Sequence, residues 1–116
     1  MKQHRYQITV EHLADAQGNP STHAEPLRFE AGNHDDILAI AERMRGRGEF
    51  PPDTANALAV GLKLFSEVML ENRGHPLFAD FAPHFRAFMQ HLKKGSQRSA
   101  GDAPATDASP ESDQAQ

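Results

Sequence analysis

The sequence predicts an α+β domain in which an N-terminal antiparallel β-hairpin packs against three α-helices. Two segments before residue 32 alternate apolar and polar residues, which is typical of half-buried strands. Beyond residue 33 the apolar residues recur every three or four positions, which is typical of amphipathic helices. The segment 54–72 carries an apolar arc of about 160°, wider than that of an ordinary surface helix, so we expect it to be the central helix.

The hairpin is predicted from residues 2–13 and 25–31. The residues expected to face inward are Tyr6, Ile8 and Val10 in the first strand and Leu27, Phe29 and Ala31 in the second. Turn-forming residues at 15–20 connect the two strands. Pro26 cannot donate to a ladder, so the second strand either lies at an edge or begins after this residue.

Three helices are predicted to follow the hairpin. The first has Asn33 as its N-cap and ends at Gly46. The second is capped by Asp53 and runs to about residue 73. The third begins near Ala82 and ends at Gly95. The residues expected on the buried faces are Ile37, Ile40, Ala41 and Met44 in the first helix, with Leu38 beside them, Leu58, Leu62, Phe65 and Met69 in the second, and Phe81, Phe85, Phe88 and Leu92 in the third.

Residues 1–94 are expected to form one domain, and residues 95–116 a disordered tail. The tail contains no large apolar residue, so it cannot bury enough surface to offset the entropy lost on ordering. Residues 75–78, between the second and third helices, are expected to form a turn or a short helical segment.

Composition and charge argue against a disulfide-bonded protein, a membrane protein and a nucleic-acid-binding protein. The 116 residues include no cysteine and no apolar run long enough to span a bilayer, so we expect neither disulfides nor a membrane span. The N-terminus lacks the apolar segment of a signal peptide, which favours a cytoplasmic protein. Residues 1–94 carry 11 Lys and Arg against 12 Asp and Glu. A nearly neutral domain lacks the field that attracts nucleic acid or anionic lipid, so we expect neither as a partner.

The densest basic cluster consists of Arg43, Arg45 and Arg47. The neighbouring glycines leave backbone N–H groups free, so the cluster would suit a phosphate group or an acidic protein partner. Cations also interact favourably with the C-terminus of a helix, and this structural role explains the same residues.

No catalytic, metal or cofactor site is predicted. His84 and His91 are seven residues apart, and two helical turns separate them by about 10 Å, which is too far for one ion. Glu67 and Glu71 lie on the polar side of the central helix, and we interpret them as a solvated face rather than as paired catalytic carboxylates. The sequence offers no cysteine nucleophile and no motif that positions a reactive serine.

A homodimer is expected from the hairpin. Two strands alone are marginally stable, and each leaves an outer edge unpaired. Two chains can pair their hairpins across a two-fold axis and form a four-stranded sheet. This pattern favours a non-enzymatic binding or regulatory protein that acts through protein–protein contacts.

A second hypothesis is a small-molecule-binding protein or enzyme with a pocket between the hairpin and the helices. Its polar residues would be His4, His12, Tyr6 and Arg28, which lie on or beside the strands. DNA binding in the manner of strand-and-two-helix repressors is less favoured, because the solvent face of the first strand is not basic.

Three runs of residues carry a family resemblance: MKQHRYQITVEHLAD, EPLRFEAGNHDDILAIAERMRGRGEF, and ALAVGLKLFSEVMLENR followed by HPLFADFAPHFRAFM. They resemble a family of small bacterial proteins, the domain-of-unknown-function family numbered three-eight-six-one. The resemblance covers residues 1–94 and implies a bacterial cytosolic α+β domain. It implies no activity, cofactor or catalytic residue, so no role is transferred to this chain.

Overall fold

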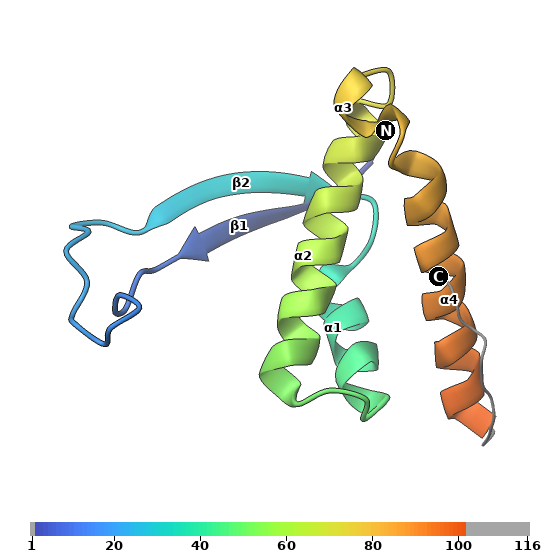
Figure 1. Cartoon of the computed structure of the whole chain (residues 1–116), viewed down its shortest axis with the longest axis horizontal. Helices are drawn as coiled ribbons and strands as arrows, with labels where there is room; N and C mark the ends of the chain where they lie inside the picture. The colour runs from blue at the N-terminus through green and yellow to red at the C-terminus, as the bar shows by residue number, and fades with distance from the viewer. Residues whose placement is uncertain (1, 102–116) are drawn as a thin grey trace.

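The computed structural model describes residues 2–101, with side chains through residue 94, as a two-stranded hairpin followed by four helices (Figure 1). The elements are β1 (His4–Val10), β2 (Leu27–Asn33), α1 (Ile37–Gly46), α2 (Pro52–Glu71), α3 (Pro76–Ala79) and α4 (Ala82–Gly101). The predicted α+β fold class is confirmed. The short helical segment expected at 75–78 corresponds to α3. Most of the predicted disordered tail, residues 102–116, lies outside the described residues.

The strands of the hairpin are antiparallel, and Ile8 lies opposite Phe29 while Val10 lies opposite Leu27. Residues directly opposite each other share a face of the sheet. The register therefore confirms that the predicted apolar residues of the two strands form one continuous face. The strand β2 begins directly after Pro26, as its missing N–H group requires.

The loop of the hairpin is organised by Asp15. Its carboxylate accepts the backbone N–H groups of Asn19 at 2.9 Å and Gln17 at 3.0 Å. The hydrogen bond from the backbone of Asn19 contributes most to lowering the pKa of Asp15 below 3.8. Gly18 adopts a φ of 91°, which glycine reaches without steric cost. The predicted turn at 15–20 is confirmed.

The hairpin extends away from the helices and meets them at the end of β2, beside α2 and the start of α1 (Figure 1). There the Tyr6 hydroxyl donates to the carbonyl oxygen of Asp35 at 3.0 Å and accepts the N–H of Ile37 at 2.9 Å. Farther out the apolar face is uncovered, and Val10 and Leu27 are 56% and 62% exposed. The prediction that this face is buried is therefore wrong for its outer half, because no described helix reaches it.

The core lies between α1 and α2. Ala55 and Ala59 are completely buried one turn apart on α2, and they contact Ala41 and Met44 of α1. Small side chains at the contact let the two helices approach closely. The buried face of α2 is therefore rotated from the predicted one, and Phe65, expected inside, is 41% exposed.

The helix α4 lies along α2 (Figure 1), and the Phe65 ring of α2 contacts edge-on the rings of Phe81, directly before α4, and Phe85, within α4. Its half-buried apolar residues are Phe85, Met89 and Leu92, at positions i, i+4 and i+7. This face is also rotated from the predicted one. In the helical region, the side chains predicted to be buried that the structure instead exposes are Phe65, Phe81 and Phe88, and Leu38, expected beside the buried stripe, is also exposed.

The helix ends differ from the predicted ones by a few residues. Asp36, not Asn33, is the N-cap of α1, and its carboxylate accepts a backbone N–H at 3.2 Å. The helix α2 begins at residue 52 without a side-chain cap, so Asp53 lies in its first turn. The backbone of α4 continues past Gly95 to Gly101, because a glycine inside a helix costs only about 1 kcal/mol.

Between residues 2 and 101, none of the helices has the length and apolar character that crossing a bilayer requires.

Candidate functional site

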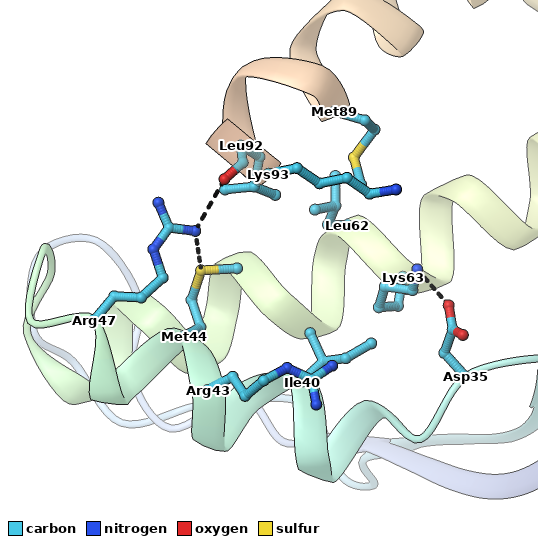
Figure 2. A pocket seen from close by; sticks show the side chains of 10 residues that line it. All are labelled: Asp35, Ile40, Arg43, Met44, Arg47, Leu62, Lys63, Met89, Leu92 and Lys93. Carbon is cyan, nitrogen blue, oxygen red and sulfur yellow. Dashed lines mark hydrogen bonds and ion pairs between the residues drawn. The ribbon is translucent and has the colours of Figure 1, made fainter. Parts of the chain in front are cut away.

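A pocket of about 400 Å³ lies between α1, α2 and α4, and Figure 2 shows its side chains. Each helix contributes apolar residues to it. Ile40 and Met44 lie one turn apart on α1, Leu62 comes from α2, and Met89 and Leu92 come from α4. The three helices thus direct their apolar faces at a shared space that they do not fill completely.

Two of the three clustered arginines line this pocket, and the third does not. Arg43 and Arg47 are four residues apart, so they lie on the same side of α1, and both line the pocket (Figure 2). Arg45 does not line it; its guanidinium donates to the side chain of Asn56 at 2.6 Å. The side chains of Arg43 and Lys93, the exposed cations of the pocket, have no hydrogen bond or ion pair with the residues described.

Arg47 joins α1 to α4. Its side chain is only 11% exposed, and one terminal nitrogen donates to the carbonyl oxygen of Leu92 at 3.4 Å. The other terminal nitrogen forms an ion pair with Glu49. The Nε–H of the same guanidinium is buried and has no hydrogen-bond partner in the described part of the chain.

An ion pair closes one end of the pocket (Figure 2). The Lys63 ammonium lies 2.7 Å from the Asp35 carboxylate. The hydrogen bond from Lys63 is the main cause that lowers the pKa of Asp35 below 3.8. The Asp35 carboxylate is therefore ionised near neutral pH, and it compensates the positive charge of Lys63.

The same pair also lines a second pocket, of about 390 Å³, which contains a buried carboxylate. Glu67 is only 7% exposed. One of its oxygens lies 2.8 Å from Nδ1 of His34 and accepts a hydrogen bond from the Gln3 amide at 2.7 Å. The interpretation of Glu67 as part of a solvated face is therefore wrong.

The burial of Glu67 could have been predicted from the spacing of residues in the sequence, although the residues concerned are either small or charged and so do not look like a buried helix face. Ala55, Ala59, Lys63 and Glu67 are spaced by four residues, so they form one line along α2. The alanines face α1, and the polar half of the same line faces the end of β2. There Gly32 leaves room for the Gln3 side chain, since a Cβ at this position would collide with its amide.

The other predicted binding residues do not converge. His4 stacks on the Tyr6 ring with the centroids 6.2 Å apart, whereas His12 lies at the far end of the hairpin, 2.6 Å from the Ser21 hydroxyl. Arg28 is exposed on the polar face of β2. Neither of the two pockets above is lined by any of them. Within residues 2–101, no three His, Asp or Glu side chains are grouped to hold a metal ion.

Comparison with known proteins identifies the family. The sequence model of DUF3861, described as a domain of unknown function with a solved structure, matches residues 4–94. The chain belongs to this family. A crystal structure of a protein of unknown function from Pectobacterium atrosepticum is similar to this DUF3861 chain, with 44% identity and a TM-score of 0.68. The similarity covers 80% of this chain and 99% of that chain. No curated protein matches the sequence.

Proposed function

We propose that this DUF3861 protein is a non-enzymatic, cytosolic homodimer that acts through protein–protein contacts. We further propose that the apolar face of the hairpin holds the two chains together. The observation that carries the proposal is the exposure of this face, on which Val10, Leu27 and Phe29 are 56%, 62% and 43% exposed. Neighbouring apolar side chains on one sheet face are normally covered, because water contact is unfavourable for all of them.

A second copy of the chain is the proposed cover for two reasons. A two-stranded hairpin is marginally stable by itself, and the fully buried apolar residues between α1 and α2 include three alanines, Ala41, Ala55 and Ala59, which bury little surface each. An apolar face can also pack against its own copy across a two-fold axis, which closes the assembly at two chains.

Contacts beyond the dimer are proposed for α1. Arg43 and Arg45 are both exposed, on different sides of this helix, and an acidic protein surface or a phosphate group would be attracted to either. The cytosolic location is supported by the absence of cysteine, which suits a reducing compartment.

The test compares two neighbouring substitutions on β1. Val10→Asp places a charge on the apolar face, whereas Thr9→Asp places the same charge on the opposite face. Both side chains are exposed next to each other on β1, so we expect the two substitutions to affect the folding of the single chain equally. We expect Val10→Asp to weaken dimerisation at least about 100-fold in sedimentation experiments, because each dimer would bury two unpaired carboxylates. Thr9→Asp should remain dimeric. Equal behaviour of the two variants would refute the hairpin interface.

A further inference from the structure

We infer that the pocket between α1, α2 and α4 binds a small amphipathic anion, a molecule with an apolar body and one carboxylate or phosphate group. This inference goes beyond the proposed dimer, because the pocket is built within one chain and the hairpin does not line it. Its volume of about 400 Å³ lies within the range of small-molecule sites, roughly 300–1,000 Å³.

The apolar body of the ligand is specified by the lining of the pocket. Ile40, Met44, Leu62, Met89 and Leu92 direct aliphatic and thioether groups at the space between the helices (Figure 2). Methionine side chains are flexible and polarizable, so the two in this lining can adapt to an aliphatic chain or a ring.

The sign of the ligand charge follows from the charged residues around this lining. Lys63 is neutralised by Asp35, and Arg47 by Glu49. Arg43 and Lys93 project from α1 and α4 on the two sides of the pocket and have no acidic partner among the described residues. The pocket therefore carries uncompensated positive charge, which attracts an anion and disfavours a cation.

Titration calorimetry on the full chain tests the inference with four probes: decanoate, decyl phosphate, decanol and inorganic phosphate. We expect one decanoate or decyl phosphate per chain, with the tighter of the two identifying the preferred head group. Decanol and inorganic phosphate each lack half of the required chemistry and should bind at least about tenfold more weakly. Decanol binding as tightly as both anions, or no saturable binding of either anion, would overturn the inference.

Two matched variants compare the loss of positive charge inside the pocket with the loss of positive charge outside it. Arg43→Gln combined with Lys93→Gln removes the two uncompensated charges and should weaken decanoate binding about tenfold or more. Arg45→Gln removes a charge from the same helix outside the pocket and should change binding less than about twofold. Equal binding by the two variants would contradict the assignment.

Two further variants locate the ligand and separate this inference from the proposed dimer. Leu62→Trp fills the pocket, so a variant with wild-type circular dichroism should lose decanoate binding; retention of binding would overturn the site. The Val10→Asp chain should still bind decanoate, whatever its oligomeric state, because the hairpin does not line the pocket. Loss of binding in a folded Val10→Asp chain would count against a site within one chain.

Discussion

Glu67 shows how a polar residue can hold this small fold together. Its carboxylate is nearly buried and contacts Gln3, which precedes β1, and His34, which follows β2. Three segments far apart in the sequence therefore meet at one side chain. Because a carboxylate only accepts hydrogen bonds, the Gln3 amide and Nδ1 of His34 are the donors in these contacts.

Removing this carboxylate should destabilise the fold. Glu67→Ala removes the acceptor of the short contacts from Gln3 and His34, and we expect a loss of about 2 kcal/mol in the free energy of unfolding. Glu71→Ala is the control, because Glu71 lies one turn further along α2, is exposed, and accepts only a longer hydrogen bond of 3.4 Å from Gln3. Urea unfolding checks both variants, and equal stabilities would mean that the Glu67 contacts contribute nothing measurable.

The Asp35–Lys63 pair should make a small contribution that depends on pH. The pKa of Asp35 is lowered in the folded chain, so its stabilisation is present above the unfolded pKa of 3.8 and is lost as the pH falls through the folded pKa. Asp35 is half exposed, so we expect Asp35→Asn to cost only roughly 0.5 kcal/mol near neutral pH. Urea unfolding at a series of pH values should show this difference shrinking below about pH 4. A difference that grows with acidity would contradict the pair.

At the scale of elements, the periodic patterns predicted which segments are strands and helices but not which helix faces are buried. The prediction followed the large residues of α2, such as Phe65, whereas α1 packs on the alanines at 55 and 59. Close packing of two helices favours small residues at the crossing, and hydrophobicity alone ranks alanine too low to reveal this. The same bias made Glu67 look like part of a solvated face.

The sequence predicted the residues that α1 contributes to the candidate pocket but not those that α4 contributes. The cluster of Arg43, Arg45 and Arg47 is visible in the sequence, and the helical period already separates Arg45 from the other two. The contribution of Met89 and Lys93 depends on how α4 lies against α1 and α2, which no local pattern encodes. The tertiary arrangement is therefore what turns a basic helix end into a pocket.

The alanine contact gives a direct test of how α1 and α2 pack. Ala59→Leu inserts three carbon atoms where the side chain is completely buried, so we expect a loss of about 1–3 kcal/mol. Ala57→Leu is the matched control, because Ala57 is exposed on the same helix and leucine is also a good helix former. Thermal unfolding of the two variants should differ clearly. A tolerated Ala59→Leu would place the helix contact elsewhere.

At the scale of the whole molecule, the chain has two apolar surfaces that its own described residues do not cover. One is the outer half of the hairpin, with Val10, Leu27 and Phe29. The other lies at α4 and carries the half-exposed rings of Phe81, directly before the helix, and Phe88, within it. A second chain that covers the hairpin would bury the first of these surfaces and would remove the isolation of a two-stranded sheet.

The most direct measurement is the mass of the unmodified chain in solution, determined by light scattering over a range of concentrations. We expect twice the 12.8 kDa of one chain, maintained on dilution to low micromolar concentration, because an interface that covers the hairpin faces would be apolar. A mass of 12.8 kDa at every concentration would contradict the homodimer and would leave the uncovered hairpin face for a different protein.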